Sequence, residues 1–443
     1  MTCLDTFPTL CHWEEQGDIP MKYLLNGLLA LALTSAVLGG CGAQETARNS
    51  RINRFEETIP QFAGPDPFAV LLGAFNNVLD TEATGSLPTT SLEALMEEYR
   101  IPGVAVAVIE DYEIDWIKGY GKIHAGRDIG IDPDTYFEAG STTKTLTAAL
   151  VMKLAEQGQL DLDRDVNEYL ESWHLPGSPL MGGEKVTLRR LLSHLSGLSE
   201  GNNFGAIDGG IPTLVDVLTG RAPATNEPVT IEFTPGTRWH YSNFGFIVIQ
   251  LALEDHLNRS YAELMQEYIF DPLQMRRSTF AHHDKQAIRD EAIVPHDENG
   301  DPHERAMNPV IKAHGDLQIS ASDLASFTIE LMRAYQGEPS ALFSQQTARE
   351  MLHLSRRILP EEFFGLRGYA YGLGVFLLGD DNAPYFIGPG TNNPGATCML
   401  IANPETGQGA VLMTNGQQGL LLNLQMAAAL SLVYDWPSQS SGG

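Results

Sequence analysis

A serine and a lysine three positions apart, Ser141 and Lys144, are the residues of this chain best suited to nucleophilic chemistry. On a helix, residues three apart lie on one face one turn from each other, so the amine can reach the hydroxyl. A hydroxyl is a weak nucleophile at neutral pH and needs a neighbouring base or a field that stabilises its anion. Lys144 and the helix N-terminus can supply that field, and Tyr241, in the sequence Tyr241-Ser242-Asn243, a second proton carrier. Ser-x-x-Lys and Tyr-x-Asn each occur once, and together they indicate a serine acyl-transfer enzyme.

The elements that must position these residues are strands at both ends of the chain and helices between them. A β-rich run at 103–109 has a hairpin partner at 113–122, and residues 137–140 lead the chain to Ser141. Helical spacing follows over 145–157 and stops at Gly158. Further strands are predicted at 371–378, 385–388, 396–402 and 409–414, and helices at 68–79, 91–99 and 420–434. The pattern predicts an α/β (α+β) fold, in which one sheet built from both chain ends carries an inserted, mainly helical domain.

The composition narrows the classes of partner. Lysine and arginine number 28 against 56 aspartate and glutamate, a net charge of −28 over 443 residues. This acidic excess argues against binding nucleic acid, which relies on basic residues at the phosphates, and against lying on an anionic lipid surface. We interpret the charge as a means of staying soluble, and the steering of cationic substrates is the alternative.

The N-terminal segment has the pattern of an export signal. Met21-Lys22, an apolar run over 23–38 and small residues before Cys41 describe a signal peptide, and Leu38-Gly39-Gly40-Cys41 resembles a bacterial lipoprotein processing site. We therefore expect residues 1–20 to be a mis-annotated extension, 21–40 a lipoprotein signal peptide, Cys41 the lipidated residue and 41–66 a flexible tether. The protein would be exported and held by its lipid on the periplasmic or outer face of a bacterial membrane. An uncleaved membrane anchor is the alternative.

The remaining cysteine and the histidines indicate no disulfide or metal site. With Cys3, Cys11 and Cys41 in or before the processed segment, Cys398 is left alone, in an apolar run typical of a protein core. Histidines at 282, 283, 296, 303 and 314 have acidic neighbours, but their spacing matches no compact ligand motif. We expect no cofactor and no metal.

Several further motifs make the chain similar to a known family from about Leu92 to Tyr434. Residues 137–144, Phe-Glu-Ala-Gly-Ser-Thr-Thr-Lys, resemble the first motif of the serine β-lactamase and penicillin-binding-protein superfamily. The branch it resembles most holds class C β-lactamases, D-alanyl-D-alanine carboxypeptidases and related esterases. The stretches that fit this branch are Leu-Leu-Ser-His-Leu-Ser-Gly-Leu at 191–198, Pro-Gly-Thr-Arg-Trp-His-Tyr-Ser-Asn at 235–243, Ala-Ser-Asp-Leu-Ala at 321–325 and Tyr-Gly-Leu-Gly at 371–374.

The resemblance implies a role for each residue of the constellation. Ser141 would be the nucleophile that forms an acyl-enzyme, Lys144 would help deprotonate it, and Tyr241 would pass protons to the leaving group. Asn243 would hydrogen-bond the acyl substrate or hold Lys144. Whether Lys144 or Tyr241 is the base stays open at this point. One oxyanion-hole donor would be the backbone N–H of Ser141.

The third motif departs from the family's Lys-Thr-Gly or His-x-Gly. The stretch here is Gly388-Pro389-Gly390-Thr391-Asn392-Asn393-Pro394-Gly395. One alignment puts Pro389 at the position of the cation and Thr391 at that of the glycine, and the other uses Gly388-Pro389-Gly390. Neither contains a cation, and the second oxyanion amide would be that of Thr391 or Asn392. Without the cation, an anionic substrate loses a charge-assisted contact of about 1.5–3 kcal/mol, which a neutral ester does not need.

Three further features give weaker evidence for a catalytic role. Residues 197–201, Gly-Leu-Ser-Glu-Gly, match a nucleophile elbow, but that motif needs a strand before Ser199, where helical spacing is found instead. His194 is expected to support local structure, and His314-Gly315 falls where the family runs a strand near the active site.

These observations predict a β-lactamase-like serine hydrolase domain over 67–438, with an antiparallel sheet flanked by helices. Its α/β part covers about 85–165 and 365–438, and its helical part about 166–364. The expected reaction is hydrolysis of small esters or amides through an acyl-serine. D-Ala-D-Ala carboxypeptidase or β-lactamase activity is one alternative, and a non-catalytic surface binding lipoprotein is the other. Loops 202–230 and 362–369 are expected to set acyl specificity.

Overall fold

The computed structural model describes residues 44–438, except residues 65, 281–287, 289, 304–308 and 380–384. The chain divides into two compact units, Met1–Ile52 and Asn53–Gly443, and the fold given below is that of the second. The expected extension, signal peptide and lipidated Cys41 lie outside the described residues. Among the helices that the structure describes, none is both long and apolar enough to cross a lipid bilayer.

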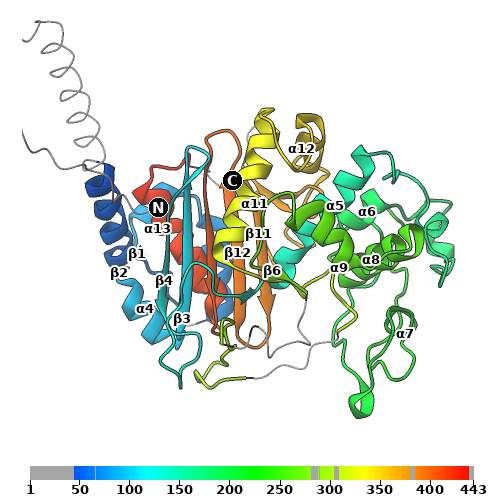
Figure 1. Ribbon diagram of the computed structural model, residues 1–443, viewed down its shortest axis with the longest axis horizontal. Helices are drawn as coiled ribbons and strands as arrows, with labels where there is room; N and C mark the ends of the chain where they lie inside the picture. The colour runs from blue at the N-terminus through cyan, green and yellow to red at the C-terminus, as the bar shows by residue number, and fades with distance from the viewer. Residues whose placement is uncertain are drawn as a thin grey trace, which may run out of the picture. The chain divides into compact units, whose positions relative to one another are not determined.

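One antiparallel sheet of eight strands is built from both ends of the second unit, as predicted. The hairpin β3–β4 lies at one edge, and β3 pairs with the C-terminal strand β13, so the two chain ends meet inside the sheet (Figure 1). Every residue of β12 is buried, because helices cover both faces. In sheet order the strands are β4 (Glu113–Gly121), β3 (Gly103–Glu110), β13 (Gln408–Thr414), β12 (Ala396–Asn403), β11 (Tyr385–Asn392), β10 (Phe376–Leu378), β9 (Tyr369–Tyr371) and β8 (Arg356–Arg357).

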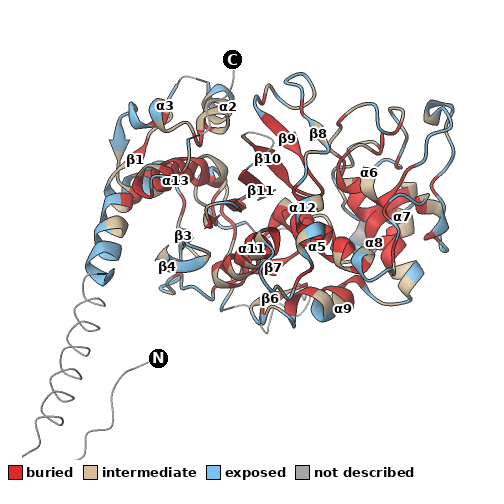
Figure 2. Ribbon diagram, turned by 90° about the horizontal axis from the view of Figure 1, so that it is seen from above, coloured by how far each residue is buried: buried red, intermediate tan, exposed pale blue. Residues whose placement is uncertain are grey.

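Helices pack on the two faces of this sheet. On one face α13 (Gly419–Val433) contacts β12 and β13, and on the other α11 (Ala321–Gln336) contacts β3, β12 and β13 (Figure 2). Beside α13 lie α2 (Pro67–Asn77), α3 (Thr81–Gly85) and the short strand β1 (Ile59–Pro60). Strand β1 pairs with β2 (Thr89–Thr90), and α4 (Leu92–Glu98) follows in the chain. Cys398, on β12, is fully buried, as expected of a core residue.

The inserted part consists of short helices around a long, buried one. Helix α5 (Thr143–Glu156) has a nearly continuous buried surface, because it lies between the sheet and the helices of the insertion (Figure 1). A small sheet of β5 (Phe137–Glu138), β7 (Gln318–Ile319) and β6 (Ser278–Thr279) leads into it. The other helices are α6 (Leu188–Leu192), α7 (Leu214–Thr219), α8 (Asn243–Leu257), α9 (Tyr261–Met265) with the following π-turn Gln266–Phe270, and α12 (Gln345–Met351).

Three local expectations differ from the structure. The segment 41–66, expected to be a flexible tether, is helical over 44–57, and Phe55 is fully buried with its ring 5.7 Å from that of Trp116. Phe55 and Ile59, two apolar residues set among polar ones, are buried in the second unit. The single strand expected at 371–378 is two strands, β9 and β10, because Gly374 has φ of +74° and turns the chain. The strand expected at 385–388 continues to Asn392.

Candidate active site

Ser141 lies in a 3₁₀ turn, η1 (Gly140–Thr142), that runs directly into α5. Gly140 precedes it with φ of +52°, and a Cβ at this position would lie 2.8 Å from the backbone nitrogen of Thr391 on β11. Gly390 makes the same kind of approach, since a Cβ there would lie 2.0 Å from the carbonyl oxygen of Ala139. Two glycines therefore allow the turn that holds Ser141 to press against the middle of the sheet.

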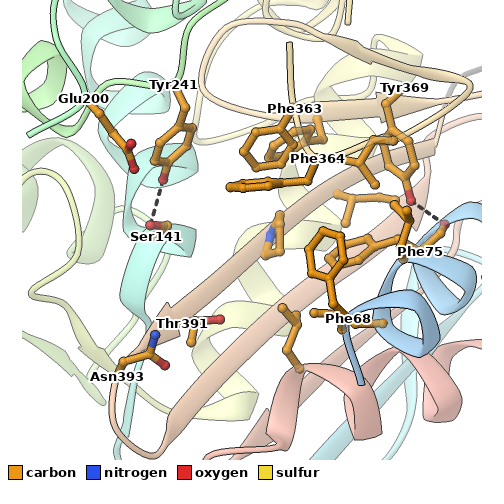
Figure 3. A pocket seen from close by; sticks show the side chains of 17 residues that line it. Phe68, Phe75, Ser141, Glu200, Tyr241, Phe363, Phe364, Tyr369, Thr391 and Asn393 are labelled. Atoms are coloured by element: carbon orange, nitrogen blue, oxygen red, sulfur yellow. Dashed lines mark hydrogen bonds between the residues drawn. The ribbon is translucent and has the colours of Figure 1, made fainter. Parts of the chain in front are cut away.

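Three functional groups that lie apart in the sequence converge on Ser141. The Nζ atom of Lys144, one turn along α5, is 3.0 Å from the Ser141 Oγ. The hydroxyl of Tyr241 donates to the same oxygen at 2.8 Å (Figure 3). The Ser141 hydroxyl thus has an amine and a phenol within hydrogen-bond distance, which is the geometry that activation of a serine requires.

Lys144 is almost completely buried, with 2% of its surface exposed. Its Nζ atom donates to the backbone carbonyl of His314 at 2.7 Å and lies over the rings of Tyr241 and Phe246 at 5.1 and 5.5 Å. Burial lowers the pKa of its amine well below 10.5, because water no longer solvates the charge. A neutral amine can accept the Ser141 proton, so the electrostatics favour Lys144 over Tyr241 as the base.

The pKa of Tyr241 is shifted in the opposite direction to that of Lys144. Burial raises the pKa of its phenol, the charge of Glu200 raises it further, and the hydrogen bond with Ser141 opposes the shift. The phenol is therefore protonated at neutral pH, which suits a group that donates a proton to Ser141 or to a leaving group. Glu200 lines the same cavity (Figure 3).

His194 supports the segment that holds Tyr241. It is fully buried, its Nδ1 accepts a hydrogen bond from the backbone of Ser242 at 3.1 Å, and its carbonyl accepts one from His240 at 2.9 Å. Its ring packs 4.4 Å from that of Tyr241, and burial lowers its pKa well below 6.5. A buried imidazole that packs on the ring of Tyr241 supports the local structure here, which is the role expected from the sequence.

Asn243 lies near this group but does not hold Lys144. Its Nδ2 donates to the carbonyl of Gly201 at 2.9 Å, and its backbone N–H donates to the backbone carbonyl of Glu200 at 2.6 Å, at the start of α8. The alternative that Asn243 holds the lysine is therefore wrong. The carbonyl of His314, which the sequence did not suggest for this purpose, takes that position.

The third motif lies on β11, and its side chains alternate. Pro389 and Thr391 line the cavity that contains Ser141, whereas Gly390 faces the turn η1. Asn392 also points away from the cavity, since its Nδ2 donates to Glu138 at 2.9 Å and to the Gly315 carbonyl at 3.3 Å. Period-2 alternation thus places positions 389 and 391 beside the nucleophile, with no charge at either.

The cavity beside Ser141 has a volume of about 430 Å³ and is largely apolar. Glu200 is the one charged side chain among the described residues that line it, and no lysine, arginine or histidine is among them. The loop 362–369, expected to set specificity, supplies part of the wall. The sequence reading missed the rest of the apolar wall, including the α2 side chains. The lining residues are Phe68, Leu71, Leu72, Phe75, Ser141, Glu200, Tyr241, Phe363, Phe364, Leu366, Tyr369, Phe376, Ile387, Pro389, Thr391, Asn393 and Leu420.

The other candidate motifs lie elsewhere. Ser199 follows α6 rather than a strand, and its Oγ accepts a hydrogen bond from the Thr230 backbone, so it has no nucleophile-elbow geometry. Of the histidines at 282, 283, 296, 303 and 314, His282 and His283 lie outside the described residues. His296 is buried and accepts from the Ala125 backbone at 3.1 Å. Within the described part of the chain, no three His, Cys, Asp or Glu side chains lie close enough to hold a metal ion.

Known proteins resemble this chain in sequence and in fold. Penicillin-binding protein 4 of Amycolatopsis lactamdurans is 25% identical over 333 residues, 73% of this chain and 83% of that protein. Protein flp of Staphylococcus aureus (strain MRSA252) is 22% identical over 330 residues, 74% of this chain, which spans 62% of that protein's length.

Two solved structures have the same fold. The octameric penicillin-binding protein homologue from Pyrococcus abyssi superposes with a TM-score of 0.66 and 24% identity, covering 79% of this chain and 77% of that one. D-alanine carboxypeptidase AmpC from Burkholderia cenocepacia superposes with a TM-score of 0.59 and 20% identity, covering 82% and 99%. The Beta-lactamase family model matches residues 90–433, which include the whole Ser141, Lys144 and Tyr241 constellation. The chain therefore belongs to the β-lactamase family, within the superfamily of serine hydrolases that includes β-lactamases and D-alanine carboxypeptidases.

Proposed function

We propose that the protein hydrolyses small neutral esters or amides through an acyl-serine intermediate on Ser141. The neutral amine of Lys144 takes the hydroxyl proton as the Ser141 Oγ bonds to the substrate carbonyl carbon. The leaving group departs with the proton of Tyr241, and the Lys144 ammonium returns a proton to Tyr241. Water then attacks the acyl group by the same relay, which releases the acid and restores Ser141. The hydrogen bonds of 3.0 and 2.8 Å to the Ser141 oxygen support this sequence of steps.

The backbone N–H of Ser141 and that of Thr391 or Asn392 are the donors we propose for the carbonyl oxygen as it becomes negative. The close approach of η1 to β11 at Gly140 and Gly390 supports this assignment. Donors held in place before the reaction stabilise the developing charge without reorganisation, and each contributes about 3–4 kcal/mol of barrier lowering in a well-studied serine protease.

The character of the cavity supports a neutral substrate. A substrate carboxylate would find no cation among the described residues that line it, and it would lie in the field of Glu200. The missing charge-assisted contact costs about 1.5–3 kcal/mol, roughly 10- to 150-fold in binding. This single observation, an apolar cavity with one negative group beside Ser141, favours an ester or a small amide over a peptide that ends in a carboxylate.

The second candidate is a D-alanine carboxypeptidase or β-lactamase activity, which is supported by the likeness to the carboxypeptidase from Burkholderia cenocepacia and by the family match. One panel of substrates separates the two: p-nitrophenyl acetate and butyrate, a D-Ala-D-Ala peptide and a cephalosporin. We expect the esters to be turned over far better. Efficient cephalosporin or peptide hydrolysis would contradict the ester preference.

Labelling with a fluorescent phosphonate tests the nucleophile against the alternative of a non-catalytic binding protein. We expect labelling of the wild type, none of Ser141→Ala, and unchanged labelling of Ser199→Ala, the matched control on the rival Gly-x-Ser-x-Gly motif. A wild type that resists labelling would support the binding protein.

We also propose that the protein is exported and anchored through a lipid on Cys41, on the basis of the Leu38-Gly39-Gly40-Cys41 sequence. In cells fed labelled palmitate, Cys41→Ser should lose the label that the wild type acquires. A labelled Cys41→Ser protein would refute the assignment.

A further inference from the structure

One wall of the cavity beside Ser141 comes from a helix outside the region that the family model matches. Helix α2 covers Pro67–Asn77, and the match begins at residue 90. Its side chains Phe68, Leu71, Leu72 and Phe75 all line the cavity, and they follow the i, i+3, i+4, i+7 spacing of a helical stripe (Figure 3). A segment that precedes the region matched by the family model therefore forms part of the cavity beside Ser141.

The position of α2 is fixed by contacts other than this stripe. Ala74 and Val78 are buried to 1% exposure or less, where α2 packs on α13. The Tyr369 hydroxyl donates to the Phe75 carbonyl at 2.8 Å, and the Arg367 backbone N–H donates to the Asn76 side chain at 2.9 Å. The C-terminal end of α2 is thus tied to the segment 362–369, which also lines the cavity.

The other end of the stripe opens to solvent at the rim of the cavity. Phe68 is 52% exposed and Phe364, on the loop, is 69% exposed, and their rings meet edge to face with centroids 6.2 Å apart. Leu71 and Leu72, between this rim and the buried end, are partly exposed to the cavity. Covering this exposed apolar surface with an apolar ligand is favourable, because it removes the surface from water.

We propose that the α2 stripe binds the apolar acyl chain of the substrate, so that the enzyme prefers esters of extended apolar acids over acetate. The proposal rests on the proposed function, since Ser141 would carry the acyl group and itself lines the cavity. Each methylene that enters the cavity adds about fourfold to kcat/KM, the equivalent of burying one CH₂ group. The preference for longer chains should end where the chain has filled the stripe and reached the rim.

The first experiment measures kcat/KM for p-nitrophenyl esters from acetate to octanoate. In the wild type we expect a rise of about fourfold per methylene over the first members. Leu71→Ala and Leu72→Ala should each lower the ratio of the octanoate to the acetate value by at least about tenfold. Ala69→Leu, on the exposed side of α2 and outside the cavity lining, should keep the wild-type ratio. A flat profile in the wild type, or an unchanged ratio in both alanine variants, would overturn the proposal.

A second readout does not depend on turnover and separates this proposal from the proposed function. In Ser141→Ala, the neutral apolar fluorophore N-phenyl-1-naphthylamine should bind with a saturable Kd and be displaced by 1-octanol. Leu72→Trp, which fills the cavity, should weaken that Kd at least about tenfold, while Ala69→Leu should not change it. Absence of saturable binding, or binding that Leu72→Trp leaves intact, counts against the α2 site. If the fluorophore binds as expected but the wild type hydrolyses no ester faster than Ser141→Ala does, the proposed reaction is wrong and the α2 site stands.

Discussion

Replacing Lys144 with methionine tests whether this lysine is neutral in the folded protein. Burial holds the pKa of its amine well below 10.5. Between that lowered pKa and 10.5, the unfolded chain binds a proton at this residue and the folded chain does not. The free energy of unfolding of the wild type therefore rises with pH, relative to a variant that lacks the lysine, by about 1.4 kcal/mol per pH unit.

The other effects of Lys144→Met do not change with pH in this way. The variant loses the hydrogen bonds to the Ser141 hydroxyl at 3.0 Å and to the His314 carbonyl at 2.7 Å, each of which contributes about 1 kcal/mol. That loss shifts the whole stability curve by a constant amount. The stability of Lys144→Met relative to the wild type is consequently greatest at low pH and falls as the pH rises towards 10.5.

Urea unfolding at a series of pH values from neutral to alkaline measures this difference. Ser141→Ala is the matched control, because it removes the same hydrogen bond and the activity but keeps the lysine, so its curve should keep the wild-type slope. Parallel curves for the wild type and Lys144→Met would show that the folded protein retains the proton. The role of Lys144 as a neutral base would then be refuted.

Four further predictions concern the site. Tyr241→Phe should lower the acylation rate at least about a hundredfold, measured by stopped-flow release of p-nitrophenol, and a near-normal rate would mean that its role is misassigned. The rate of acylation should rise with pH through the lowered pKa of Lys144 and then level off, because Tyr241 stays protonated; a rate that falls over the same range would reverse the assignment. Gly390→Ala should destabilise the fold by about 1–3 kcal/mol or more in urea, since its methyl group would lie 2.0 Å from the Ala139 carbonyl, and unchanged stability would argue against the close approach. Pro389→Lys should raise acylation by a carboxylate-bearing peptide, relative to an ester, by roughly 10- to 100-fold, and no gain would show that this position does not meet the substrate.

The local part of the site could be predicted from the sequence, and its long-range part could not. The spacing of Ser141 and Lys144 placed their side chains on one face of a helix, and the structure has them 3.0 Å apart. That Tyr241 reaches the same oxygen follows from the tertiary fold, because no local spacing in the sequence places a residue one hundred positions away. The carbonyl that holds Lys144 belongs to His314, and backbone groups leave no trace in the residue types.

The sequence left the burial of two N-terminal segments open for the same physical reason. The helix expected at 68–79 is present as α2, but a stripe of leucines and phenylalanines does not say which surface it will cover. Part of that stripe faces the cavity beside Ser141. Likewise the polar composition of 41–66 predicted a tether, whereas a few apolar residues, Phe55 and Ile59 among them, are enough to bury part of the segment. The register of the third motif needed the strand pairing itself, Pro389 with Met399 and Thr391 with Thr397.

The most direct test is to identify the covalent intermediate. The protein would be mixed with p-nitrophenyl butyrate, quenched in acid during turnover, digested and mapped by mass spectrometry. We predict one butyryl group on the peptide that contains Ser141, absent from Ser141→Ala and formed far more slowly in Lys144→Met. Turnover without an adduct on Ser141, or with the adduct on another side chain such as Ser199, would contradict the reaction proposed for this site.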